Sequence, residues 1–355
     1  QKYLQVDYIS FESRPLTLDI LKKSHSAFPE IELLSSEFVA QLPPRWPGLH
    51  RRDFLGGNIR LHLIYGDAEK HLRSAEFSAD AWFLDGFAPS KNPQLWTESL
   101  LLDVGRLTCD GGTFASFTAA QSVRKRLSNA GFQVEKREGF GKKKHMTIGV
   151  KLILNKLARP KISNDIKIGI IGGGIAGAAV SSGLILRGVV PKIIEANNKL
   201  ASSASGNRLG IQAPRLSLDH SKLSYLSSNC LSRAAWVSDQ AGSSFQRGVI
   251  SLDWPEREAV RQAKFRQQTW PEELLKPLNA DEVSVAAGVN MNLGGLMHEW
   301  GRVIDPKLLT EHLATGADVE LGCEVNKISE KDNGINVSTS DGKSFVFDRL
   351  VLAGG

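Results

Sequence analysis

Residues 166–177 read IKIGIIGGGIAG, a short apolar strand that runs into glycines spaced G-x-G-x-x-G, and residues 178–188 continue with helical character. In this strand–turn–helix context Gly172 permits the tight turn, and Gly174 lets backbone amides approach a pyrophosphate. Gly177 lets the helix pack closely on the strand, and the helix N-terminus, with Ile175 and Ala176, faces the phosphates. The stretch predicts a dinucleotide-binding α/β fold.

An acidic residue follows the next predicted strand, residues 191–194. Glu195 lies 23 residues beyond Gly172 and is placed to accept hydrogen bonds from both ribose hydroxyls, which disfavours a 2′-phosphate. Residues 200–210 then form a loop of small residues, where an NAD dehydrogenase would normally continue with a helix and a strand. This loop resembles that of FAD proteins of the glycine and D-amino-acid oxidase type, so FAD is the expected cofactor.

The last part of the chain predicts a meander of strands over residues 318–325, 334–339 and 344–347. Residues 349–354 follow as an apolar strand that resembles the return strand of FAD domains, and it would bring Ala353 and Gly354 to the cofactor.

The first part of the chain alternates predicted strands (6–10, 59–65, 81–84 and 111–117) with predicted helices (17–26, 96–107 and 119–130). It ends in a predicted hairpin of residues 132–137 and 145–153, a layout typical of a class I, Rossmann-like methyltransferase sheet. We therefore expect a methyltransferase domain at 1–154, a polar linker at 155–165 and an FAD-dependent oxidoreductase domain at 166–355. We also expect the first strand and glycine loop of the former, and the C-terminal part of the latter, to lie outside this sequence.

Residues 82–93, WFLDGFAPSKNP, place a carboxylate and an aromatic ring just after a predicted strand, where open α/β sheets bind ligands. A primary amine with a pKa near about 10 is normally protonated and cannot attack a sulfonium methyl group. Asp85 can accept a proton or hydrogen bond from such an amine and orient its lone pair, while Phe87 can stack on a flat base. The alternative is that Asp85 only caps the turn that follows it.

Two further acidic residues follow predicted strands of the same sheet. Glu12 is placed to hold the ribose hydroxyls of S-adenosylmethionine, and Asp67 to read its adenine amino group. For each of them, a solvated strand end is the alternative interpretation.

Positive charge is concentrated near the end of the first domain. The chain has a net charge of +6, and residues 102–160 contain 12 basic but only 4 acidic residues. Such a concentration favours a polyanionic partner, with RNA phosphate contacts from the basic residues, although lysines that only solubilise a hairpin are the alternative. The candidates are Lys91, Arg124, Lys125, Arg126, Lys142, Lys143 and Lys144.

Several classes of protein are not expected from the composition. No apolar run approaches the ~20 residues of a membrane helix. The three cysteines are far apart and the eight histidines form no cluster, so neither a disulfide framework nor a metal site is predicted, and a cytoplasmic protein is expected. The sequence leaves the oligomeric state open, with a monomer favoured.

These motifs, in this order, resemble the family of bifunctional tRNA 5-methylaminomethyl-2-thiouridine biosynthesis proteins, MnmC, over nearly the whole chain. The resemblance rests on residues 82–93, on residues 136–143 and on residues 170–177, with support from residues 204–208 and 301–309. It implies that FAD-dependent oxidation converts a carboxymethylaminomethyl group at the tRNA wobble uridine to aminomethyl, and that S-adenosylmethionine then methylates this amine.

By matching position, the resemblance makes Asp85 the catalytic residue of methyl transfer. It adds Ser205, Asn207 and Gly210 to the glycines and Glu195 as FAD contacts, and Val325 as a backbone contact to the adenine. It assigns no general base for the oxidation.

Two rival functions remain at this point. One is a single-function FAD-dependent amine or amino-acid oxidase with a vestigial N-terminal domain, for which a damaged Asp85 motif would be expected. The other is a non-catalytic RNA-binding adaptor, which would have little use for Glu195 at its spacing. For the 355-residue piece taken alone, we expect impaired activity in both halves.

Overall fold

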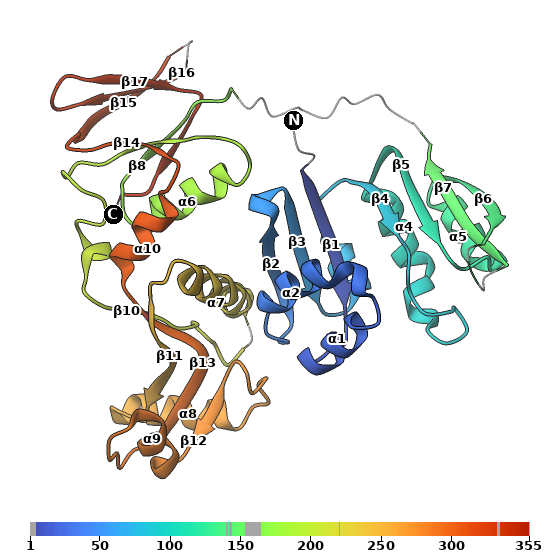
Figure 1. The fold of residues 1–355 in the computed structure, drawn as a ribbon, viewed down its shortest axis with the longest axis horizontal. Helices are drawn as coiled ribbons and strands as arrows, with labels where there is room; N and C mark the ends of the chain where they lie inside the picture. The colour runs from blue at the N-terminus through green and yellow to red at the C-terminus, as the bar shows by residue number, and fades with distance from the viewer. Residues whose placement is uncertain are drawn as a thin grey trace. The chain divides into compact units, whose positions relative to one another are not determined.

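The computed structural model describes residues 5–139, 141, 144–152, 165–219, 221–331 and 334–354 (Figure 1). Within them, contacts define two compact units. The first takes in residues of the ranges 1–10, 15–63 and 162–355, and the second takes in residues of the ranges 11–14 and 64–161. The expected division into 1–154, 155–165 and 166–355 is therefore not the division that contacts produce, and it stays a prediction.

The second unit is built on a four-stranded sheet in the order β4-β5-β7-β6. Its elements are α3 (Ala68–Arg73), β4 (Ala79–Phe83), η3 (Pro93–Trp96), α4 (Glu98–Arg106), β5 (Thr108–Ser116), α5 (Gln121–Asn129), β6 (Phe132–Glu138) and β7 (His145–Lys151). β4 and β5 are parallel, whereas β6 and β7 form the expected antiparallel hairpin. Leu101, Val123 and Leu127 are fully buried between the helices and the sheet, which sets the core of this unit.

The first unit contains the predicted dinucleotide-binding sheet, in the order β14-β9-β8-β18, with every pair parallel. Its elements are β8 (Ile168–Ile171), α6 (Ile175–Ile185), β9 (Lys192–Ile194), β14 (Asp318–Glu320) and β18 (Arg349–Leu352). An antiparallel meander follows β14 in the chain, made of β15 (Val325–Lys331), β16 (Gly334–Thr339) and β17 (Ser344–Phe347). The prediction of one strand over residues 318–325 was wrong, because residues 318–320 extend the parallel sheet and the meander begins at Val325.

A second sheet of the first unit has the order β10-β13-β11, with β12 also paired to β13. This part consists of η4 (Ala204–Gly206), β10 (Gly210–Gln212), α7 (Lys222–Gln240), β11 (Ser244–Leu252), α8 (Glu256–Arg266), β12 (Lys276–Leu278), α9 (Ala280–Ala287), β13 (Gly295–Ile304) and α10 (Pro306–Leu313). Asp305 begins α10 by accepting hydrogen bonds from the backbone N–H groups of Lys307 and Leu308.

The N-terminal strands also contribute to the first unit, as a sheet in the order β1-β3-β2. Its elements are β1 (Val6–Glu12), α1 (Leu18–His25), η1 (Pro29–Ile31), α2 (Glu32–Ala40), β2 (Gly48–Phe54), η2 (Leu55–Gly57) and β3 (Ile59–Tyr65). The expected single methyltransferase sheet is thus two sheets in the described residues, since β1 pairs with β3 and β4 pairs with β5. Figure 1 shows α7 next to β2, two elements that are in contact.

In the part of the chain that the structure describes, no helix is long and apolar enough to cross a membrane.

Candidate functional site

The glycine loop between β8 and α6 has the close backbone approaches that the fingerprint predicts. Gly172 has a φ of +111°, and a Cβ there would lie 2.8 Å from the backbone of Ala353 and of Gly354. A Cβ on Gly177 would lie 2.0 Å from the carbonyl oxygen of Gly172. Side chains at either position would force the loop open, so the glycines form a cradle of bare backbone that fits a pyrophosphate.

Glu195 holds this loop from the end of β9. Its Oε2 accepts a hydrogen bond from the N–H of Gly173 at 2.6 Å, and its Oε1 accepts from the N–H and the Nδ2 of Asn197 at 2.9 and 2.7 Å. Only 9% of Glu195 is exposed. The Glu195 carboxylate therefore holds the glycine loop in place. It also lies at the end of β9, where a ribose contact is expected.

The predicted loop contacts converge on the start of α6. Ser205 Oγ accepts a hydrogen bond from the N–H of Ile175 at 3.0 Å, and Gly174 is the N-cap residue of α6. Asn207 follows η4 and is exposed, as is Ala176 in the first turn of α6. The small-residue loop thus reaches the helix end that would face the phosphates.

Three further predicted contacts lie at strand ends. Ala353 follows β18, and its N–H donates to the carbonyl of Ile171 at 2.8 Å, which carries Ala353 and Gly354 along the rim of the glycine loop. Gly210 begins β10, and Val325 begins β15. The structure therefore gathers residues 172–177, 195, 205, 353 and 354 around one edge of the parallel sheet, and their contacts to FAD stay a prediction.

A different cavity lies in the second unit, beside Asp85. It has a volume of about 360 Å³ and is lined by Phe83, Leu84, Asp85, Ala115, Ser116, Phe117 and Met146. Asp85 is exposed, and no hydrogen bond or ion pair of its carboxylate is found among the described residues. Its carboxylate is therefore available to a ligand, and it does not cap the following turn.

The residues that form the other walls of this cavity were not predicted from the sequence. Ser116 and Phe117 stand at the end of β5, the strand next to β4, and Met146 stands in β7. Parallel neighbouring strands end at the same edge of a sheet, and this was the signal that could have identified Ser116.

The loop that carries Asp85 and Phe87 is held from behind by Trp96. The buried Trp96 donates a hydrogen bond from Nε1 to the carbonyl of Phe87 at 2.8 Å. Its own carbonyl accepts a hydrogen bond from Arg126. The Phe87 ring is 73% exposed, so a flat base can stack on it.

The two other predicted acidic residues belong to the same unit as Asp85. Phe11, Ala68 and Leu84, the neighbours of Glu12, Asp67 and Asp85 in the chain, all pack against one hydrophobic core. Glu12 accepts a hydrogen bond from the N–H of Arg14, and Asp67 accepts one from the N–H of Lys70 as the N-cap of α3. Asp67 therefore has a local structural role in addition to the one predicted.

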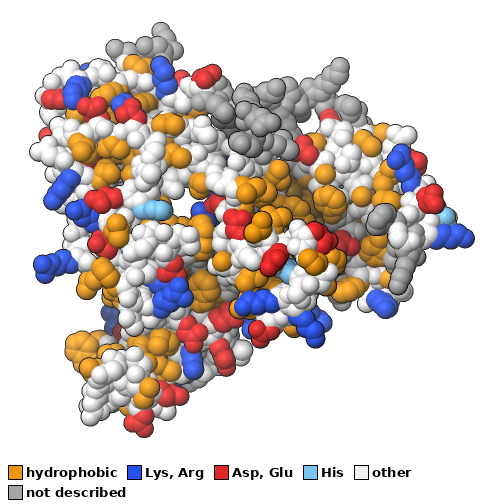
Figure 2. Space-filling model, viewed as in Figure 1, with side chains coloured by type: hydrophobic (Ala, Val, Ile, Leu, Met, Phe, Trp, Pro, Cys, Tyr) orange, Lys and Arg blue, Asp and Glu red, His pale blue; other side chains and the backbone are white. Residues whose placement is uncertain are grey.

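The basic residues divide into internal and exposed ones. Arg126 binds the Trp96 carbonyl, and the Nε of Arg124 is buried without a hydrogen-bond partner in the described structure. Lys91, Lys125 and Lys144 are exposed, whereas Lys142 and Lys143 lie outside the described residues. On the face shown in Figure 2, Lys and Arg side chains are mixed with Asp and Glu.

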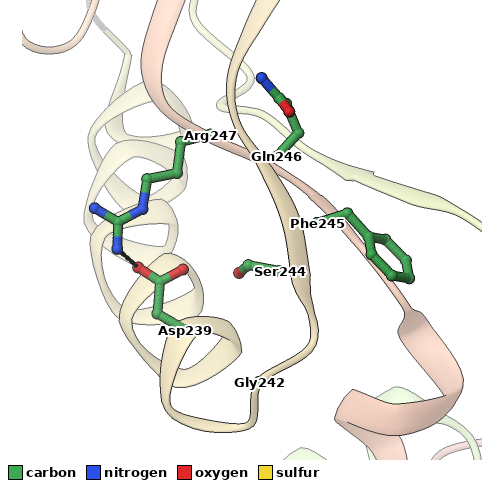
Figure 3. A pocket seen from close by; sticks show the side chains of 6 residues that line it. All are labelled: Asp239, Gly242, Ser244, Phe245, Gln246 and Arg247. Atoms are coloured by element: carbon green, nitrogen blue, oxygen red, sulfur yellow. Dashed lines mark hydrogen bonds and ion pairs between the residues drawn. The ribbon is translucent and has the colours of Figure 1, made fainter.

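A further hollow of about 280 Å³ lies at the C-terminal end of α7, lined by Asp239, Gly242, Ser244, Phe245, Gln246 and Arg247 (Figure 3). Although burial raises the pKa of Asp239, hydrogen bonds from Arg302 and ion pairs with Arg302 and Arg247 lower it below its usual value. None of the predicted cofactor contacts lines this hollow.

Two known protein families match the chain, one over each of the parts that hold these candidate sites. Residues 167–355 match the family described as FAD-dependent oxidoreductase, and residues 29–152 match the family described as S-adenosyl-L-methionine-dependent methyltransferase. Because the first match covers more than half of the chain, the chain belongs to the family of FAD-dependent oxidoreductases. The fold class and the two expected cofactors, FAD and S-adenosylmethionine, are confirmed.

Among individual proteins, the chain is similar to the tRNA 5-methylaminomethyl-2-thiouridine biosynthesis bifunctional proteins MnmC. It is 35% identical to that of Aeromonas salmonicida over 99% of this chain and 56% of the relative. It is 36% identical to that of Chromobacterium violaceum over 87% of this chain and 49% of the relative. The chain thus spans about half the length of the curated relatives that it matches.

Among solved structures, the chain is similar to glycine oxidase from Geobacillus kaustophilus, with a TM-score of 0.44, 23% identity, and coverage of 54% of this chain and 56% of that one. The L-proline dehydrogenase from P. horikoshii gives a TM-score of 0.42 at 21% identity, covering 54% and 53% of the two chains.

Proposed function

We propose that the protein modifies the wobble uridine of tRNA in two steps, as the names of its MnmC relatives suggest. One observation supports this proposal most strongly. The two family matches follow one another in a single chain, and 99% of this chain aligns with such a protein at 35% identity. The first step converts carboxymethylaminomethyl-(2-thio)uridine to aminomethyl-(2-thio)uridine, and the second methylates the product amine.

In the first step, the secondary amine loses a proton and a hydride, forming a carbon–nitrogen double bond toward the carboxymethyl carbon. FAD, when bound, supplies the two-electron acceptor. Water then adds to the imine carbon, and the carbon–nitrogen bond breaks to leave the aminomethyl uridine and a two-carbon aldehyde acid. The protein's own residues hold the dinucleotide in this step. Gly172, Gly174 and Gly177 would lie at the pyrophosphate and Glu195 at the ribose.

In the second step, the amine nitrogen attacks the methyl group of S-adenosylmethionine, and the sulfur–methyl bond breaks to leave S-adenosylhomocysteine. The amine must first lose a proton, and the Asp85 carboxylate beside the cavity is placed to accept it or to orient the neutral amine. Alignment of the lone pair with the methyl carbon is worth more than proton abstraction alone, because positioning reduces the entropic cost of the reaction. Glu12 and Asp67 would hold the ribose and adenine of the methyl donor, and Phe87 would stack on the base.

Contacts to the tRNA backbone are assigned to exposed cations around the second unit. Lys91, Lys125 and Lys144 are free to reach phosphates, whereas the contacts that Arg126 makes to Trp96 favour a structural role for that residue. We retain the domain limits 1–154 and 166–355 in this proposal. Because the proposed substrate is a tRNA, we also expect the reaction to take place in the cytoplasm.

The test is nucleoside mass spectrometry on tRNA that carries carboxymethylaminomethyl uridine, incubated with the full-length protein. We expect aminomethyl uridine without S-adenosylmethionine and methylaminomethyl uridine with it. Unchanged tRNA from a protein that holds FAD would refute the proposal and would favour oxidation of a small-molecule amine.

A further inference from the structure

Residues 41–54 lie within the methyltransferase match, but they pack against residues of the oxidoreductase match. Neither family description mentions such a contact. We name these residues the docking segment; they comprise the turn after α2 and strand β2. Both partners lie in the first compact unit, although the sequence that separates them includes residues 64–161 of the second unit.

The docking segment supplies a side chain to a core that is otherwise made by the oxidoreductase match. Trp46 is 1% exposed and clusters with Leu216, Phe265, Leu274, Leu275 and Leu296. Its ring also meets the edge of Trp300, with the ring centroids 5.8 Å apart. Removing a buried tryptophan from such a core leaves a large cavity and is strongly destabilising.

Polar contacts then fix the register of β2 on α7. The fully buried His50 bonds through Nε2 to the Trp46 carbonyl at 2.9 Å and through Nδ1 to Ser232 Oγ at 3.3 Å. Arg52, also fully buried, donates to the same Ser232 Oγ at 3.1 Å and to the Gln41 carbonyl at 2.7 Å. One serine of α7 therefore joins two side chains of β2.

An ion pair closes the far end of the contact. Asp53 is 8% exposed and lies 2.5 Å from Nη2 of Arg233 on α7, with Arg51 on its other side at 2.8 Å. At the opposite end, Arg45 pairs with Glu273 at 3.2 Å. Removal of one partner from a buried pair leaves an uncompensated charge, so this contact tolerates little change.

The approach of the backbones is equally specific. Gly48 has a φ of +134°, and a Cβ there would lie 2.2 Å from Oδ1 of Asn229 on α7. Only glycine lets β2 come this close to the helix.

We propose that the docking segment completes the core of the oxidoreductase part, so that the FAD-binding part depends for its stability on residues of the methyltransferase part. The proposal uses FAD only as a reporter, and in that respect alone it rests on the proposed function. It predicts that the two parts stay joined when the chain between them is cut, and that damage to β2 loosens the flavin.

The first experiment inserts a protease site into residues 155–161 of the full-length protein and cuts it. We expect the two pieces to elute together on gel filtration, and to separate when Asp53→Arg and Trp46→Ala are combined. Separation of the unmutated pieces would overturn the proposal. This readout needs neither FAD nor tRNA, so it is decided even if the proposed function fails.

The second experiment follows flavin fluorescence on heating of the full-length protein. Trp46→Ala should lower the midpoint of flavin release by roughly 10 °C. Leu49→Ala, in the same docking segment but with a side chain that is 46% exposed, should shift it by less than about 2 °C. Equal midpoints for wild type and Trp46→Ala would refute the dependence. If Trp46→Ala does not fold, Asp53→Asn serves instead, with an expected shift of about 5 °C and the same refuting result.

Discussion

The contact between Glu195 and the glycine loop leads to a prediction for Glu195→Gln. Gln has the same shape, but one carboxylate oxygen becomes an NH₂ group that donates hydrogen bonds. Glu195 accepts from Gly173 on one oxygen and from Asn197 on the other, and all three of its partner groups are donors. Whichever way the amide turns, its NH₂ group faces at least one N–H donor in a buried site.

The size of the effect follows from that conflict. An unpaired buried donor costs about 1–3 kcal/mol, and the lost charge-assisted bond to a cofactor hydroxyl adds to this in the bound state. Part of the cost of the unpaired donor is also present in the apoprotein, and this part does not affect the dissociation constant because it is the same in the free and bound states. We therefore expect the dissociation constant of FAD to rise roughly 10- to 100-fold, since each 1.4 kcal/mol is about tenfold.

The assay titrates the apoprotein with FAD and follows the change in flavin fluorescence. Asp318→Asn is the matched control, because it removes one carboxylate at the opposite end of the neighbouring strand β14, where Asp318 pairs with Lys192 and is exposed. The control should bind FAD within about twofold of wild type, since exposed ion pairs contribute little.

A dissociation constant for Glu195→Gln within threefold of wild type, in a protein with an unchanged melting temperature, would refute this reasoning. It would mean that neither the tether to Gly173 nor the ribose contact matters to cofactor affinity.

Three further predictions concern the other parts of the chain. Asp85→Asn in the full-length protein should reduce methyl transfer at least 100-fold and leave flavin reduction unchanged; loss of both would make Asp85 structural. Trp96→Phe keeps a smaller buried aromatic ring but removes the hydrogen bond to the Phe87 carbonyl, so labelled methyl transfer should fall about 3- to 10-fold and the melting temperature should fall with the cavity, whereas an unchanged rate would show that the loop needs no such support. Burial lowers the pKa of His50 from 6.5 to about 4. Below pH 6.5 the unfolded chain gains a proton that the folded chain does not bind until about pH 4, so stability falls across this window by at most about 3 kcal/mol. His50→Gln should flatten that loss, as measured by urea midpoints at pH 7 and pH 4.5, and an equal loss in both proteins would contradict it.

The dinucleotide site was predictable because its determinants are local. Gly172, Gly174 and Gly177 are required by backbone geometry within one strand–turn–helix unit, and Glu195 follows from the length of that unit. The hairpin of β6 and β7 and the position of Asp85 after β4 are local in the same sense, since strand patterns and strand ends can be located in the sequence. The walls of the cavity beside Asp85 required knowledge of which strands are neighbours.

The order of the two parts, the dinucleotide fingerprint and the acidic residue of each candidate site can all be recognised in the sequence. Two other features emerge only in the folded chain: Trp46 lies in a core with Leu274 and Leu296, and Arg126 supports Trp96 instead of facing solvent. Neither has a local signal, because a buried position is defined by partners far away in the chain. Trp46 lacks a local signal because its environment is created by residues more than 150 positions further on, and no periodicity in the neighbouring sequence reveals which surface will cover it.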